Sequence, residues 1–158
     1  MAKVSNLEEL KEALSLESIE QIEVLNSITI DEPIDKTIII PEDIDNITLN
    51  FQGQKVKELI VKGDSNTIKG ATVLTLNVAS TVENLYLENI QDMDGSEHIF
   101  NGGGGESIKL IGNTTFRGNI KIVSGTDIQI TAESNDAKIE GTVSIESNAK
   151  TTISAPVS

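Results

Sequence analysis

The residues best suited to chemistry form a short acidic run near the middle of the chain. Asp92, Asp94 and Glu97 are separated by one or two residues, and alternating carboxylates followed by a glycine can place oxygen ligands around Ca²⁺. The run departs from an EF-hand loop at both ends, because Ile90 takes the place of the first ligand and Asn101 that of the bidentate glutamate. The sequence therefore gives a calcium candidate on three carboxylates, with a solvated polar loop as the alternative.

The acidic run belongs to a polar, glycine-rich segment, residues 89–106, which interrupts the pattern on either side of it. The four glycines at 102–105 offer no side chain for packing, and ordering them costs backbone entropy. Loops on rigid scaffolds commonly carry binding residues. We therefore expect a loop insertion that projects from a corner of the fold, with His98, Phe100 and Asn101 as its binding residues.

Catalysis is not expected, and no catalytic residue is assigned. The chain has no cysteine, which excludes cysteine nucleophiles, thiolate zinc sites and disulfides. It has one histidine, so a metal site built from several histidines cannot form within one chain. Arg117, the only arginine, could serve a polysaccharide lyase but has no acidic cluster beside it in sequence. The adjacent Asp-Asp and the Gly-His-Gly signatures of polygalacturonase-like hydrolases are absent. No cofactor is expected apart from the calcium candidate.

The composition also restricts the partners. Lys and Arg total 12 against 25 Asp and Glu, a net charge of -13, and such a surface repels nucleic acid and anionic lipid. The acidity is uneven: residues 1–105 hold 7 basic and 19 acidic side chains, whereas residues 106–158 hold 5 and 6. Aromatic residues make up only 3%, which disfavours grooves that stack sugars or bases. No apolar run approaches the roughly 20 residues of a membrane span.

One amphipathic helix is predicted near the N-terminus. Asn6 can cap it, and the glutamates of its first turns interact favourably with the helix dipole. Its apolar stripe consists of Leu7, Leu10, Ala13 and Leu14. Such a helix can cover the open end of a stack of strands, which otherwise exposes strand edges and core.

The rest of the chain consists of short β-branched runs bounded by Asn, Asp, Gly, Ser or Pro, which predicts an all-β fold. A motif of one aliphatic residue, two polar or small residues, a second aliphatic, a spacer and a third aliphatic recurs. It appears at Ile19–Val24, Ile44–Leu49, Val56–Val61, Ile68–Val73 and Val82–Leu87. Equivalent positions lie about 25 residues apart, a spacing typical of a solenoid.

We therefore predict a right-handed parallel β-helix with about 25 residues per coil and a short N-terminal capping α-helix. A β-sandwich is the alternative, but its two-residue hairpin signals are missing apart from Asp94-Gly95. One domain is expected over 1–158, with a strand and the capping helix over 1–18, coils over 19–153 and a tail or linker start over 154–158. The predicted core is Ile22, Val24, Ile38, Ile47, Leu49, Leu59, Val61, Val73, Leu76, Leu85, Leu87, Leu110, Ile122, Ile130, Val143 and Ile145.

The opening at residues 4–14, followed by the apolar patterns at 19–25 and 28–30, resembles the pectate-lyase-like adhesive domains of Gram-positive surface proteins. This resemblance covers residues 1 to about 90 and rests on patterning. It implies a non-enzymatic cell-surface module for adhesion, ligand binding or spacing. It also implies an extracellular location as part of a longer exported protein, and a protein or glycan ligand. A cytoplasmic location is the alternative.

A second resemblance lies in residues 116–122 and 139–145, which are similar to the short coils of bactofilins. It implies a cytoplasmic scaffold that self-associates end to end, although bactofilins lack a capping helix of this kind and use tighter coils. An inactive relative of polysaccharide lyases or hydrolases is the third alternative.

Overall fold

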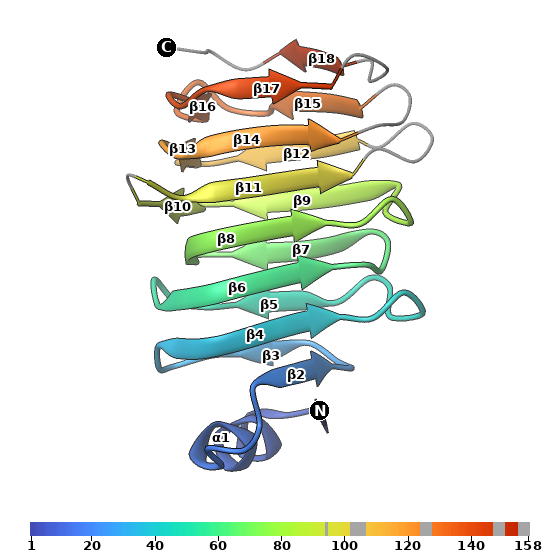
Figure 1. Ribbon diagram of the computed structural model, residues 1–158, viewed down its shortest axis with the longest axis vertical. Helices are drawn as coiled ribbons and strands as arrows, with labels where there is room; N and C mark the ends of the chain where they lie inside the picture. The colour runs from blue at the N-terminus through green and yellow to red at the C-terminus, as the bar shows by residue number, and fades with distance from the viewer. Residues whose placement is uncertain (94, 102–106, 124–127, 147–150, 155–158) are drawn as a thin grey trace.

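The chain winds into a parallel β-solenoid of about six turns, with a helix at its N-terminal end (Figure 1). This computed structural model describes residues 1–93, 95–101, 107–123, 128–146 and 151–154. In Figure 1 the near strands run to the right and the far strands to the left while the chain climbs, which is the right-handed winding expected for parallel crossovers. The predicted fold class is confirmed.

The helix α1 spans Leu7–Ser15. The strands are β1 (Ala2–Val4), β2 (Gln21–Val24), β3 (Ile28–Thr29), β4 (Ile34–Ile40), β5 (Thr48–Asn50), β6 (Lys55–Val61), β7 (Asn66–Lys69), β8 (Thr72–Val78), β9 (Asn84–Glu88), β10 (Gln91–Asp92), β11 (Glu97–Asn101), β12 (Ser107–Ile111), β13 (Thr115–Phe116), β14 (Asn119–Val123), β15 (Ile128–Ala132), β16 (Lys138–Ile139), β17 (Val143–Ile145) and β18 (Thr151–Ser154).

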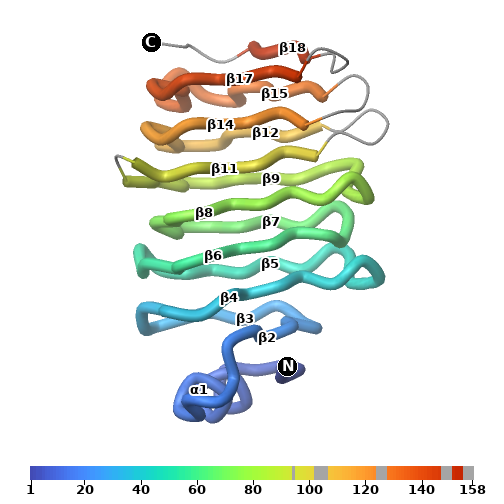
Figure 2. The backbone as a smooth tube through the Cα atoms, viewed as in Figure 1, coloured from blue at the N-terminus to red at the C-terminus, as the bar shows by residue number. Residues whose placement is uncertain are grey.

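Two parallel sheets form the walls of the solenoid. Sheet A is 11-stranded and follows the order β1-β2-β4-β6-β8-β10-β13-β16, with β11, β14 and β17 continuing from β8 beside the last three strands. Sheet B is 7-stranded, in the order β18-β15-β12-β9-β7-β5-β3. Figure 2 traces the backbone as near and far runs that alternate up the stack. Each described strand pair is parallel, so like positions of successive coils lie above one another.

The core is built from columns of aliphatic side chains that point between the two sheets. Ile22, Ile38 and Leu59 lie in register in sheet A, and Leu49 and Ile68 lie in register in sheet B. All five are fully buried. Each such side chain contributes about 1.5–3 kcal/mol on burial, so the columns supply the main force that holds the coils together.

The coils are shorter than the expected 25 residues. Strands β2 and β4 pair residues 16 apart, and β10 and β13 pair residues 24 apart. The period of about 25 residues is too long because it compares residues of different sheets. Leu59 lies in sheet A, whereas Leu85 lies in sheet B.

The capping helix covers the first coil as predicted. The side chain of Asn6 accepts a hydrogen bond from the N–H of Glu9 (2.9 Å), which satisfies one of the free donors of the first turn. Leu10 and Ala13 are buried against the solenoid. The apolar end of the core is therefore closed on this side.

The opposite end of the stack is less well covered. Of the predicted core residues, Val143 is only half-buried and the side chain of Ile145 is 48% exposed; the others are buried. Both belong to β17, which in the described part of the chain pairs with β14 alone. Among the residues that the structure describes, no strand of sheet A lies beyond β17, so these two side chains lack the shielding that side chains of lower coils receive.

Candidate functional site

The acidic run that suggested a calcium site is divided between two strands. Asp92 ends β10 and is buried, Glu97 begins β11 and is exposed, and Asp94 lies outside the described residues. Both carboxylate oxygens of Asp92 accept hydrogen bonds from protein donors, so this residue cannot join Glu97 around a cation without breaking them. Within the described residues, no three or more His, Asp or Glu side chains are grouped so that they could hold a metal ion.

The prediction of a projecting loop is wrong for residues 97–101, because they form β11 in sheet A. His98 and Phe100 are fully buried, in register with Ile120 and Ile122 of the next coil. Asn101 is half-buried and donates to the carbonyl of Val78 (3.2 Å). The sequence favours a loop here because a short strand of polar and aromatic residues beside glycines has little apolar pattern. The glycines at 102–105 lie outside the described residues.

His98 and Asp92 form a closed polar pair inside the solenoid. Nε2 of His98 lies 2.8 Å from Oδ2 of Asp92, and both side chains are 0% exposed. Nδ1 of His98 accepts a hydrogen bond from the backbone N–H of Leu76 (3.0 Å). Because that N–H can only donate, Nδ1 carries no proton, and the imidazole is neutral with its proton on Nε2, directed at Asp92. The ring of Phe116 packs edge to face against His98, with centroids 5.1 Å apart.

Asp92 is an ionised carboxylate that accepts hydrogen bonds from three donors. Besides His98, the backbone N–H of Arg117 donates to Oδ1 (2.5 Å) and that of Gly118 donates to Oδ2 (2.8 Å). Burial acts to raise the pKa of Asp92, but the hydrogen bonds from His98 and the two N–H groups outweigh it and hold the pKa below its ordinary value.

An interruption in sheet A explains why this pair exists. Strands β10 and β11 both pair with β8: Asp92 lies opposite Val73, and Ile99 lies opposite Asn77. Ile99 follows Asp92 by seven positions in the sequence, whereas Asn77 follows Val73 by only four. The extra residues break the backbone ladder at this height, as a large bulge does. The N–H groups that face the break donate to the His98–Asp92 pair instead of to a strand, which satisfies them inside the core.

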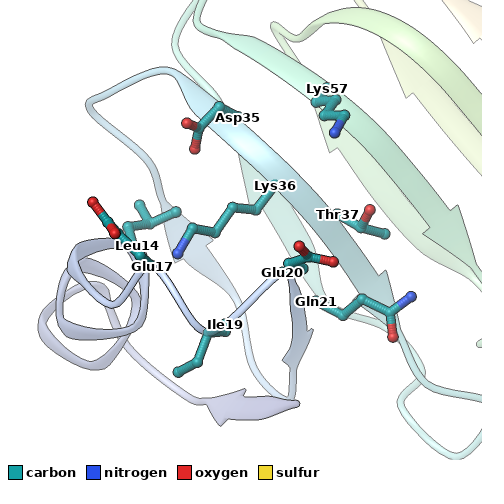
Figure 3. Close-up of a pocket in the computed structure, with 9 residues that line it drawn as sticks. All are labelled: Leu14, Glu17, Ile19, Glu20, Gln21, Asp35, Lys36, Thr37 and Lys57. Carbon is teal, nitrogen blue, oxygen red and sulfur yellow. The ribbon is translucent and has the colours of Figure 1, made fainter.

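The accessible candidate is a groove between α1 and the outer face of sheet A. It consists of two adjoining hollows of about 400 and 460 Å³ that share Leu14, Asp35 and Lys57, and we call it the cap groove. The first hollow is shown in Figure 3 and is also lined by Glu17, Ile19, Glu20, Gln21, Lys36 and Thr37. The second is also lined by Glu32, Pro33, Ile34, Lys55, Val56, Leu74 and Met93.

A β-bulge shapes the cap groove. The register between β4 and β6 shifts between Ile34 and Thr37, which leaves an extra residue on β4. From this position Lys36 reaches toward α1, and its Nζ donates to the carbonyls of Ala13 (3.1 Å) and Leu16 (2.6 Å) at the end of the helix. A cation is favourable at a helix C-terminus. Lys36 therefore holds the cap in place, a role that sequence analysis missed because its partners lie 20 and 23 residues away.

The lining of the cap groove combines charged side chains with apolar ones. Lys55 and Lys57 contribute positive charge to its lining, and Glu17, Glu20 and Asp35 contribute negative charge. The apolar floor of the second hollow includes the partly exposed side chain of Leu74. Mixed charges around an apolar floor can hold a polar ligand that has apolar side chains.

Arg117, the residue considered for a lyase, lies outside the cap groove. Its Nη1 donates to Oε1 of Gln91 (2.9 Å), and its Nε lies 3.9 Å from a carboxylate oxygen of Glu140. Both partners belong to neighbouring coils of the same wall, so the side chain links three coils on the outside of sheet A.

Comparison with known proteins adds no relative: no family model, no curated protein and no solved structure matches the chain. The resemblance to pectate-lyase-like adhesive domains thus extends as far as a shared solenoid architecture. Among the described residues, no helix is long and apolar enough to cross a membrane.

Proposed function

We propose that the chain is a non-enzymatic module of a bacterial cell surface, which binds a protein ligand in the cap groove and holds it away from the cell. One observation carries the non-enzymatic part: the pair most suited to chemistry, His98 and Asp92, is closed to solvent and bonded to backbone N–H groups. A buried pair with its hydrogen-bonding positions taken by the fold has nothing left to offer a substrate. The surface location is supported by the resemblance of residues 4–30.

The scarcity of exposed aromatic rings favours a protein ligand over a glycan. All three phenylalanines are fully buried. The single tyrosine, Tyr86, lies in sheet B with the ammonium of Lys109 5.7 Å from its ring centre, away from the cap groove. Sugar recognition commonly uses aromatic faces, whereas an extended peptide can use the charges and apolar floor of the cap groove.

Binding to immobilised fibrinogen, fibronectin and collagen tests the proposal, with a glycan array run in parallel. In Lys57→Glu the charge at the centre of the cap groove is reversed, and we expect at least about tenfold weaker binding to the protein recognised, equivalent to about 1.4 kcal/mol. Lys121→Glu, at an exposed position of β14 outside the cap groove, is the matched control and should bind as the unaltered chain does.

Three results would count against the proposal. Equal binding by Lys57→Glu and the unaltered chain would remove the cap groove from the function. Binding to glycans alone would replace the protein ligand with a carbohydrate. Release of unsaturated uronates from polygalacturonate, measured by their ultraviolet absorbance, would make the chain a lyase.

A further inference from the structure

The two hollows of the cap groove differ in the charged residues that line only one of them. Glu17 and Glu20 line the first hollow alone, and Lys55 lines the second alone. Asp35 and Lys57 line both hollows, and their opposite charges offset each other. None of these side chains forms an ion pair within the part of the chain that the structure describes. Their charges are therefore available to a ligand.

One further charged side chain in each hollow already has partners within the chain. The ammonium of Lys36 in the first hollow donates to the carbonyls of Ala13 (3.1 Å) and Leu16 (2.6 Å), so it faces the negative end of the helix dipole. Glu32 in the second hollow has the ammonium of Lys11 3.8 Å from its carboxylate. The charge that remains for a ligand is therefore negative in the first hollow and positive in the second.

Apolar side chains are concentrated in the second hollow. The apolar residues that line it alone are Pro33, Ile34, Val56, Leu74 and Met93. The first hollow has Ile19 as its own apolar residue, together with the polar side chains of Gln21 and Thr37 (Figure 3). A ligand that fills both hollows therefore gains most when its cationic group enters the first hollow and its apolar and anionic groups enter the second.

We propose that the cap groove selects an extended peptide segment in which a basic residue lies two positions from an apolar residue that has an acidic neighbour. This inference rests on the proposed function, which places a protein ligand in the cap groove. Residues two positions apart in an extended chain point to the same side and lie about 6.5–7 Å apart, so they can enter adjoining hollows. The basic side chain lies beside Glu17 and Glu20, and the apolar side chain lies on Leu74. The acidic neighbour is within reach of the flexible side chain of Lys55.

Fluorescence polarisation of labelled peptides on the full chain tests this selection. The matching peptides are Arg-Ser-Leu-Asp and its reverse, Asp-Leu-Ser-Arg, because either chain direction can place the side chains. The exchanged peptides, Asp-Ser-Leu-Arg and its reverse, have the same composition with the basic and acidic residues exchanged. Acetylated and amidated ends give all of them the same net charge, so general attraction to an acidic chain is equal. We expect the better matching peptide to bind at least about tenfold more tightly than either exchanged peptide.

Charge reversal in the first hollow tests which residues make the selection. The double substitution of Glu17→Lys with Glu20→Lys should abolish or invert the preference, because the basic side chain of the peptide would then meet two cations. The double substitution of Glu42→Lys with Asp43→Lys is the matched control. It makes the same change in net charge at exposed positions outside the cap groove, and it should keep the preference.

Three results would overturn the selection. These are equal affinity for all the peptides, no binding of any of them up to about 1 mM, and an unchanged preference after reversal of Glu17 and Glu20. Failure of the proposed function is a different result, because it is measured with Lys57→Glu and whole proteins. Weaker protein binding by Lys57→Glu without any preference among the peptides would refute the selection and leave the proposed function standing. A preference that depends on Glu17 and Glu20 would support the selection even when none of the whole proteins binds.

Discussion

Replacing Asp92 with alanine is the sharpest test of the role assigned to the buried pair. The substitution removes the acceptor for three donors: Nε2–H of His98 and the N–H groups of Arg117 and Gly118. A buried donor left without a partner costs about 1–3 kcal/mol, so the expected loss in unfolding free energy is at least about 3 kcal/mol. That is a large part of the roughly 5–15 kcal/mol that stabilises a typical domain.

Urea unfolding followed by circular dichroism measures this loss. Glu97→Ala is the control, because it removes an exposed carboxylate of the same segment and should change stability by less than about 0.5 kcal/mol. Equal unfolding midpoints for Asp92→Ala and Glu97→Ala would refute the argument that the pair holds the interrupted sheet together. A loss of cooperativity instead of a shifted midpoint would localise the damage to the coils beyond β10.

Two further predictions concern the same region. The pKa of Asp92 is lower in the folded chain than its unfolded value of about 3.9, so its contribution to stability is complete above that pH and is lost as the pH falls through the folded value. Urea titrations between about pH 5 and pH 2 should therefore give a steeper loss for the unaltered chain than for Asp92→Asn, and parallel curves would contradict this. Gly118→Ala should cost at least about 2 kcal/mol, because its Cβ would lie 2.2 Å from the carbonyl oxygen of Ser96. An unchanged thermal midpoint would show that β11 and β14, which begin directly after these two residues, can move apart there.

Local signals in the sequence were sufficient for the architecture. The stripe of α1 and the Asn6 cap depend on residues three or four apart, and the inward positions of most strands depend on simple alternation. Asn46 and Asn89 stand at strand ends as expected and adopt positive φ there, a conformation that asparagine tolerates. The coil length could not be read as easily, because the aliphatic motif recurs in both walls and does not identify its wall.

The candidate sites depended on contacts that no local pattern reveals. His98 and Asp92 are polar residues beside glycines, a composition typical of loops, yet both point into the core because of a break in the ladder. Lys36 binds helix carbonyls 20 and 23 residues away, and the bulge that directs it is a mismatch between two strands. Ile145 alternates as a core residue should, and its exposure goes with its place in the last coil that the structure describes.

Buried polar groups in this solenoid compensate for irregular coils. Asn66, fully buried, accepts from the N–H of Ile47 (2.9 Å) and donates to the carbonyl of Ile44 (2.9 Å) in the coil below. Thr114 likewise accepts from the N–H of Ile90 (3.1 Å) one coil away. In both cases, as at His98, a side chain replaces a backbone partner that the stacked strand does not supply.

If the His98–Asp92 pair also compensates for an irregular coil, shortening the segment between β10 and β11 should make His98 dispensable. Removing residues 94–96 would place Met93 opposite Leu74 and Glu97 opposite Thr75, which restores the register with β8. The N–H of Leu76 then has a strand to donate to, so His98→Leu should be close to neutral in the shortened chain but cost about 1–3 kcal/mol in the full chain. Unfolding free energies of the four chains give the coupling directly, and an equal cost of His98→Leu in both backgrounds would mean that the histidine serves something other than the interrupted sheet.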